Sequence, residues 1–226
     1  MSAQGPRQLA LALEHTESLA REDFLGGPSN ARALTLIESY PDWPGRTAVL
    51  VGPEGCGKSH LAAIWATDSG ARLLGARTLA ETHLPAALTT GALVVEDIAP
   101  GEFDERALFH LLNLAREEQA YLLLTARTTP AGWDVAIRDL GSRLKALPVV
   151  ALATPDDALL RAVLVKLFAD RQLVVDESLV GYVAARIERS FAAARAVVGR
   201  LDEEAMRLQR PLTRTLAAEI LRTQEP

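Results

Sequence analysis

The chain has 226 residues, 49% of them hydrophobic, which is enough for one medium-sized α/β domain and a small appended module. Its formal net charge of -5 argues against a protein that coats nucleic acid through its own field, although a local basic patch is compatible with it. The lone cysteine cannot form an internal disulfide, and no long apolar run follows a positively charged start. We therefore expect a cytoplasmic protein that is neither exported nor inserted in a membrane.

The first part of the chain reads as a tail followed by an α/β domain. Residues 1–22 mix Gly5, Pro6, a short apolar alternation and a polar run, which predict a loosely held tail. In residues 23–154, short apolar runs alternate with helical stretches, and this favours a parallel sheet covered by helices. The pattern predicts strands at 47–51, 71–74, 92–95, 121–125 and 149–153, with helices at 58–67 and 104–118.

Residues 155–226 have helical periodicity and no comparable strand pattern. We predict a small helical domain with helices at 156–172, 176–188, 191–209 and 213–223. Thr154 and Thr213 are the predicted helix caps, and Pro211 is predicted to break the helix before it.

The stretch VGPEGCGKS fits the phosphate-loop pattern G-x-x-x-x-G-K-[ST] between a predicted strand and a predicted helix. Gly52, Gly55 and Gly57 allow backbone N–H groups to converge on phosphate oxygens at a helix start. Lys58 would neutralise the outer phosphates, and the hydroxyl of Ser59 would ligate Mg²⁺. The alternative is a glycine turn that happens to end in Lys-Ser, which this context disfavours.

Cys56 lies inside this motif. It is either a redox sensor, which needs a depressed thiol pKa, or a small residue that fits the loop. The four histidines show no metal-ligand spacing with each other or with Cys56 and are interpreted as surface or loop residues: His15, His60, His83 and His110. His60, which directly follows the motif, is also a nucleotide-binding candidate.

A second motif is the apolar run ALVV followed by Glu96 and Asp97. In this arrangement Glu96 would support Mg²⁺ and Asp97 would position water, although Asp97 is one methylene shorter than the usual base. The alternative is a strand that ends in solvated acids. Thr125 ends the next predicted strand, where its hydroxyl either reaches the terminal phosphate or satisfies backbone groups.

The segment DLGSRLKALP contains Arg143 after a short helical pattern. Such an arginine is either an ordinary surface residue or, at a subunit junction, a finger that reaches a neighbour's nucleotide.

These elements in this order resemble an AAA+ domain, and more closely the nucleotide-binding domain of the DnaA/Hda family of bacterial replication proteins. The resemblance covers about residues 8–223 and implies a five-stranded parallel sheet with a helical lid that binds ADP or ATP and Mg²⁺. DFLGGPSNA is similar to the family stretch that passes over the adenine, so Phe24 and Leu25 are base-pocket candidates. The other motifs receive family roles: Walker A for 52–59, Walker B for 93–97, sensor I for Thr125 and the arginine finger for Arg143.

One family position departs from the pattern. The sensor II arginine of the lid is replaced by Ala192, and Arg195, three residues further on, lies close to the same helix face and is the candidate substitute. The departure implies weak or absent intrinsic ATPase activity.

The tail contains QLALAL at residues 8–13, which is similar to the family's hexapeptide for the DNA polymerase sliding clamp (β subunit). Gln8 would hydrogen-bond at a pocket edge, and Leu9, Leu11 and Leu13 supply the apolar alternation that docks in a cleft. The alternative is an apolar alternation that packs on its own domain or pairs as an edge strand.

The resemblance implies a regulator that docks on the clamp and presents Arg143 to the ATP of the initiator DnaA, which prevents re-initiation of replication. A second copy of the chain is a further candidate partner. Because no helix-turn-helix module follows the lid, we expect no autonomous sequence-specific DNA binding. The alternatives are a helicase-loader-like or DNA-associated adaptor and a stand-alone P-loop ATPase.

Overall fold

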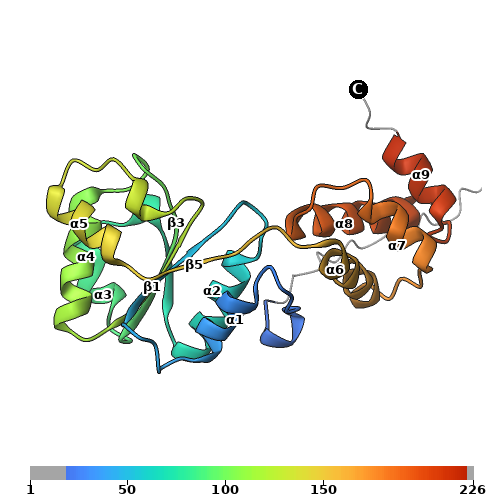
Figure 1. Cartoon of the computed structure of the whole chain (residues 1–226). Coiled ribbons are helices and arrows are strands. Elements are labelled where there is room, and N and C mark those ends of the chain that lie inside the picture. The colour runs from blue at the N-terminus through green and yellow to red at the C-terminus, as the bar shows by residue number, and fades with distance from the viewer. Residues whose placement is uncertain (1–18, 223–226) are drawn as a thin grey trace, which may run out of the picture.

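The structure, a computed structural model, describes residues 19–222, which form a sheet domain followed by a helical domain (Figure 1). The sheet has five parallel strands in the order β2-β3-β4-β1-β5, which confirms the predicted parallel sheet. The strands are β1 (Thr47–Val51), β2 (Arg72–Gly75), β3 (Ala92–Ile98), β4 (Tyr121–Ala126) and β5 (Val149–Ala151).

Helices cover both faces of the sheet because alternate strand residues point to opposite sides. In β1, Ala48 and Leu50 face one apolar core, whereas Val49 and Val51 face the other. The first core lies under α1 (Ala31–Glu38) and α2 (Lys58–Ser69). The second lies under α3 (Leu84–Ala87), α4 (Glu105–Glu117) and α5 (Arg138–Ala146). Short 3-10 turns complete the domain: η1 (Arg21–Asp23), η2 (Ala76–Thr78), η3 (Glu81–His83) and η4 (Pro130–Gly132).

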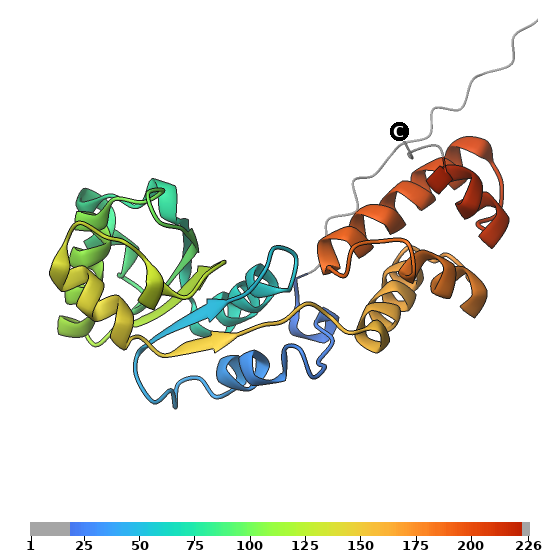
Figure 2. The same ribbon diagram turned by 45° about the horizontal axis from the view of Figure 1, so that its top comes forward.

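The chain leaves β5 and enters the helical lid, which stands beside the sheet domain (Figure 2). The strand predicted at 149–153 ends early. The N–H of Leu152 makes the last bond to β1, at Val51 O, and the N–H of Ala153 donates instead to Ser29 O, outside the sheet. The lid has its own apolar core, formed between α6 (Asp157–Asp170), α7 (Glu177–Ala184), α8 (Phe191–Leu208) and α9 (Arg214–Arg222). No helix among residues 19–222 is long and apolar enough to cross a membrane.

The helix caps correct one prediction and confirm another. Thr154 does not cap α6, because the helix begins only at Asp157; the carboxylate of Asp156 accepts the N–H of Leu159 at 2.8 Å instead. Thr213 does cap α9, since its hydroxyl accepts the N–H of Leu216 at 3.2 Å. The helix predicted at 176–188 was too long, because α7 ends at Ala184. The chain then turns, and the hydroxyl of the buried Ser190 caps α8 by accepting the N–H of Ala193.

Trp65 is the largest fully buried side chain of the core under α1 and α2. It stacks on Trp43 with ring centroids 5.0 Å apart, and its indole N–H has no hydrogen-bond partner among the described residues. We expect Trp65→Ala to lower the free energy of unfolding by about 3–5 kcal/mol, because packing is lost and a cavity remains. Urea denaturation would measure this. The control Leu73→Ala, at a side chain that is 46% exposed, should change it by no more than about 0.5 kcal/mol.

Candidate nucleotide-binding site

The phosphate loop lies between the end of β1 and the start of α2. Gly55 and Gly57 have φ values of +70° and +103°, in the left-handed region that favours glycine. At Gly52, an added Cβ would lie 2.6 Å from the carbonyl oxygen of Leu152, so the close approach of the chain just after β5 excludes a side chain. The pattern of glycines in the sequence therefore has a local steric cause.

Lys58 is held at the centre of this loop. Its ammonium donates to the carbonyl oxygens of Gly52 and Pro53, both at 2.8 Å, and the residue is only 7% exposed. Ser59 is exposed on the first turn of α2, where unpaired backbone N–H groups and the helix dipole favour an anion. The loop thus brings together a cation, a hydroxyl and a helix N-terminus, which together suit a bound phosphate chain and its Mg²⁺.

Cys56 is buried inside the loop, with Sγ 3.9 Å from the ammonium of Lys58. Burial raises the pKa of the thiol, and the nearby charge of Lys58 opposes this only in part. A reactive sensor needs a low pKa and access to solvent. The structure therefore favours the interpretation of Cys56 as a small residue that fits the loop.

The acidic pair lies near the end of β3, which runs to Ile98 and so extends past the predicted end at residue 95. The register shifts between Val95 and Ile98, and Asp97 takes a left-handed φ of +56° at this bulge. The bulge separates the two acids: Glu96 is half-buried, whereas Asp97 is exposed. Hydrogen bonding to Glu102, with a smaller contribution from the charge of Asp97, raises the pKa of Arg77, so Asp97 lies within electrostatic reach of a cation.

The carboxylate of Glu96 is the group in this site whose surroundings suit a bound metal ion. Its Oε1 is buried without a hydrogen-bond partner among the described residues. Leaving a buried charged acceptor unsatisfied is unfavourable, and Mg²⁺ or a water bound to it would satisfy this oxygen. No group of three metal-binding side chains occurs in residues 19–222. Since Mg²⁺ takes most of its ligands from phosphates and water in nucleotide sites, Ser59 and Glu96 fit such an ion.

Thr125 connects the two motifs, because β4 lies between β1 and β3. It pairs with Leu50 of β1, and its buried hydroxyl accepts the N–H of Asp97 at 3.0 Å. This bond fixes the backbone of the bulge. If Thr125 contacts a phosphate, it does so with a hydroxyl that already accepts the N–H of Asp97.

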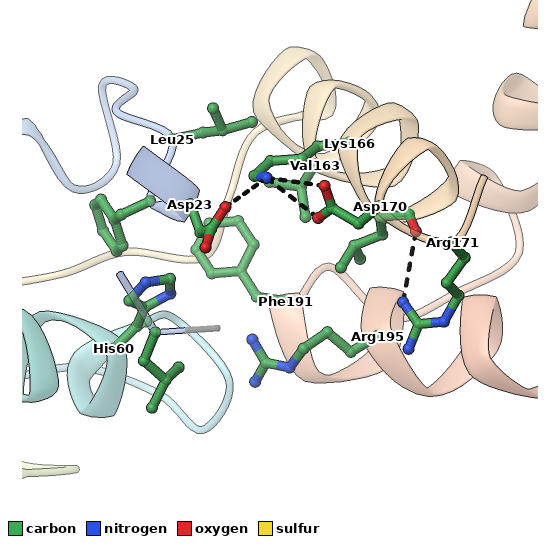
Figure 3. Close-up of a pocket in the computed structure, with 13 residues that line it drawn as sticks. Asp23, Leu25, His60, Val163, Lys166, Asp170, Arg171, Phe191 and Arg195 are labelled. Carbon is green, nitrogen blue, oxygen red and sulfur yellow. Dashed lines mark hydrogen bonds and ion pairs between the residues drawn. The ribbon is translucent and has the colours of Figure 1, made fainter. Parts of the chain in front are cut away.

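The base-pocket candidates line a cavity of about 330 Å³ between the sheet domain and the lid (Figure 3). Its volume falls in the lower range of small-molecule pockets. Phe24 packs edge-on against His60 with ring centroids 5.1 Å apart, and Leu25 and Arg195 also line the cavity. His60 is thus half-buried at this cavity and is not the surface or loop residue that its sequence context suggests.

Several residues of this cavity were missed at the level of sequence. They are polar or apolar side chains brought in by tertiary contacts: Asp23, Val163, Lys166, Leu167, Asp170, Arg171 and Phe191. Arg127 was also missed; it pairs with Glu54 of the phosphate loop at 2.8 Å, on the solvent side. The only sequence signal for the missed lid residues in 163–171 was the helical periodicity of 156–172. It predicts that one face of this helix is buried, but it does not predict which part of the protein that face contacts.

Lys166 joins the two domains across the cavity, as Figure 3 shows. Its ammonium lies 2.6 Å from Oδ1 of Asp23 and 3.1 Å from Asp170, and the side chains of Lys166 and Asp23 are 25% and 21% exposed. The hydrogen bond to Asp23, with a smaller contribution from Asp170, raises the pKa of Lys166. The ion pair therefore ties α6 to the segment that carries Phe24 and Leu25.

We expect Lys166→Met to lower the free energy of unfolding by about 1 kcal/mol at neutral pH. Because the pKa of Lys166 is raised on folding, its contribution is complete below the ordinary lysine pKa of about 10.4 and is lost as pH rises through the raised value. Denaturation from pH 7 to 11 would measure this. The difference between the wild type and Lys166→Met should be constant up to about pH 10.4 and then shrink as the pH rises, while Lys145→Met, at an exposed position on α5, should differ little throughout.

The N-terminus of α8 packs directly on the phosphate loop. The N–H of Phe191 donates to the carbonyl oxygen of Gly55 at 2.8 Å, and a Cβ on Gly55 would lie 3.0 Å from that of Ala192. The sequence position expected to carry sensor II therefore touches the loop with a methyl group alone. Arg195, one turn further on, extends along the cavity wall (Figure 3).

Arg143 lies at the opposite end of the sheet. It lines a recess of about 390 Å³ together with Gly45, Arg46 and Thr47, which precede or begin β1, whereas the phosphate loop follows β1. The five residues of β1 span roughly 16 Å. The guanidinium of Arg143 is placed over the ring of Phe109, 5.3 Å from its centroid.

Comparison with solved structures identifies this architecture as the AAA+ fold. Domain III of the replication initiation protein DnaA from Thermotoga maritima superimposes with a TM-score of 0.74 at 17% identity, over 92% of this chain and 98% of that chain. A variant of RuvB from Thermotoga maritima gives a TM-score of 0.70 at 15% identity, over 91% of this chain and 72% of that one.

A DnaA structure bound to AMPPCP and single-stranded DNA gives a TM-score of 0.65 at 18% identity, over 83% of this chain and 67% of that one. No protein-family model and no curated protein matches the sequence. The chain is therefore similar to DnaA and RuvB in fold, and its particular role must be argued from its own residues.

Proposed function

We propose that the chain is a regulatory AAA+ protein that holds ADP or ATP with Mg²⁺ and stimulates hydrolysis of ATP bound to the initiator DnaA. The observation that carries this proposal is the position of Arg143. It lies at the far end of β1 from the chain's own phosphate loop, in a recess that opens to solvent. An arginine so placed would be available to a nucleotide held by a neighbouring molecule, as an arginine finger is.

The nucleotide of the chain itself has a structural role in this proposal. Lys58 and Ser59 would hold its phosphates, Glu96 would support Mg²⁺, and Phe24 and Leu25 would enclose the base. Bound across the cavity between the domains, it would fix the lid against the sheet domain. A DnaA protein of the same fold binds AMPPCP, which supports an adenine nucleotide here.

Two features support slow turnover of the chain's own nucleotide. The water-positioning candidate Asp97 is exposed and short, and Ala192 contributes no charge to the phosphates. The decisive hydrolysis would then take place on the partner. The sliding clamp would bring the two together through Gln8, Leu9, Leu11 and Leu13, which lie outside the described residues.

The test is single-turnover hydrolysis of ATP pre-bound to DnaA, with and without clamp loaded on DNA. We expect the intact chain to accelerate hydrolysis only with the clamp, and Gln8→Ala to lose this clamp-dependent acceleration. The matched control is Gln4→Ala, in the same tail but outside the clamp motif. Acceleration that ignores the clamp would refute the clamp role. Rapid turnover by the chain alone would indicate a stand-alone ATPase instead.

A further inference from the structure

The lid carries a second cavity that shares no residue with the nucleotide site. It is a recess of about 530 Å³ bounded by α7, α8 and α9. On α8 it uses Ala193, Ala196, Val197 and Arg200, whereas the nucleotide cavity uses Phe191 and Arg195. The two cavities therefore lie on different faces of the same helix.

Three arginines from different parts of the lid converge on this recess: Arg186 after α7, Arg200 in α8 and Arg222 at the end of α9. None of them forms an ion pair with a carboxylate in residues 19–222. Other lid arginines do, since Arg189 pairs with Asp157 and Arg207 with Glu204. The recess is thus a concentration of positive charge on a chain whose net charge is -5.

Backbone carbonyls hold these guanidinium groups in place. Arg200 donates to the carbonyl oxygen of Ile220 at 2.8 Å, and Arg222 donates to that of Ala218 at 3.1 Å. Arg186 donates to Tyr182 O at 3.3 Å. Carbonyls near the C-terminal ends of helices attract cations, which explains why the guanidinium groups lie on them. Because a guanidinium has five N–H donors, each arginine keeps donors for a ligand.

The recess also has an apolar floor. Val197 is 7% exposed, and Ile187 and Leu221 pack against the lid core while still lining the recess. A free phosphate or sulfate would leave this floor unused. The floor and the arginines together suit a ligand that carries both an apolar side chain and anionic groups.

Two observations favour a peptide over a nucleic acid. Arg186 lies 3.7 Å from the ring centroid of Tyr182 and occupies that face, so a base could not stack there. Glu188 also lines the recess, and its charge disfavours a continuous phosphate backbone. We propose that this recess binds an acidic peptide segment of a partner protein, with carboxylates on the arginines and an apolar side chain on the floor.

The test uses the full chain and two labelled peptides, one of alternating Asp and Leu and one in which Ser replaces every Asp. Fluorescence anisotropy should detect saturable binding of the acidic peptide only, and added salt should weaken it. The double variant Arg186→Gln/Arg222→Gln should weaken binding at least tenfold. Both positions are exposed, and an unchanged thermal midpoint would show that the lid remains folded.

The matched control is Arg207→Gln/Arg210→Gln, which removes the same charge from lid arginines outside the recess. It should leave peptide binding within twofold of the intact chain. If both double variants lost peptide binding equally, net charge alone would explain the loss, and the proposal would be overturned. So would failure of the acidic peptide to bind at millimolar concentration. Preferential binding of oligodeoxythymidylate, lost in the recess variant, would assign the site to nucleic acid instead.

Discussion

Replacing Arg143 by alanine is expected to lower the stimulated hydrolysis of DnaA-bound ATP by about 10³-fold or more, the range found for arginine fingers. The guanidinium would stabilise charge on the transferred phosphoryl group, and alanine supplies no substitute. The measurement is single-turnover hydrolysis with the clamp present and the chain in excess. Binding of DnaA should change far less than the rate, because the finger acts in the transition state.

The control for this experiment lies on the same helix. Arg138 is exposed in the first turn of α5 and does not line the recess of Arg143, so Arg138→Ala should retain stimulation within a few-fold. Stimulation that survives Arg143→Ala would remove the basis of the proposed function. If Arg143→Ala abolished binding to DnaA as well, Arg143 would be an interface residue, and the finger role would be refuted.

The sheet could be predicted from the sequence chiefly because its three central strands, β1, β3 and β4, are buried on both faces. Such strands appear as short continuous apolar runs, and four of the five predicted starts agree with the structure. The ends were less accurate, for local reasons. β3 continues through a bulge at Glu96 and Asp97, where two carboxylates interrupt the apolar pattern.

The phosphate loop could be predicted for a different reason. Its glycines, Lys58 and Ser59 are contiguous, so the constraints that select them appear as one motif. The base pocket is not contiguous. Lys166 and Asp23 meet only because the lid folds back over η1, and helical periodicity in α6 gives no information on that contact. For the same reason the three arginines of the lid recess look like ordinary surface residues in the sequence.

Lys58→Ala is expected to weaken nucleotide binding by about 30- to 4000-fold, corresponding to the 2–5 kcal/mol lost when one partner of a buried charge pair is removed. Lys58 is 7% exposed, so its charge would act on the phosphates in an environment that screens little. Equilibrium binding of fluorescent ADP and ATP would measure this. Lys145→Ala, which removes an exposed lysine from α5, should bind normally.

The same variant distinguishes a structural nucleotide from a hydrolysed one. If the nucleotide fixes the lid, Lys58→Ala should lose stimulation of DnaA at low nucleotide concentration and regain it at concentrations that restore occupancy. Glu96→Gln, which removes the unpartnered carboxylate, should then retain stimulation wherever nucleotide still binds. Loss of stimulation in a fully occupied Glu96→Gln protein would mean that hydrolysis in the chain's own site is required. The phosphate loop would then be catalytic, and the interpretation of Asp97 and Ala192 as signs of slow turnover would be wrong.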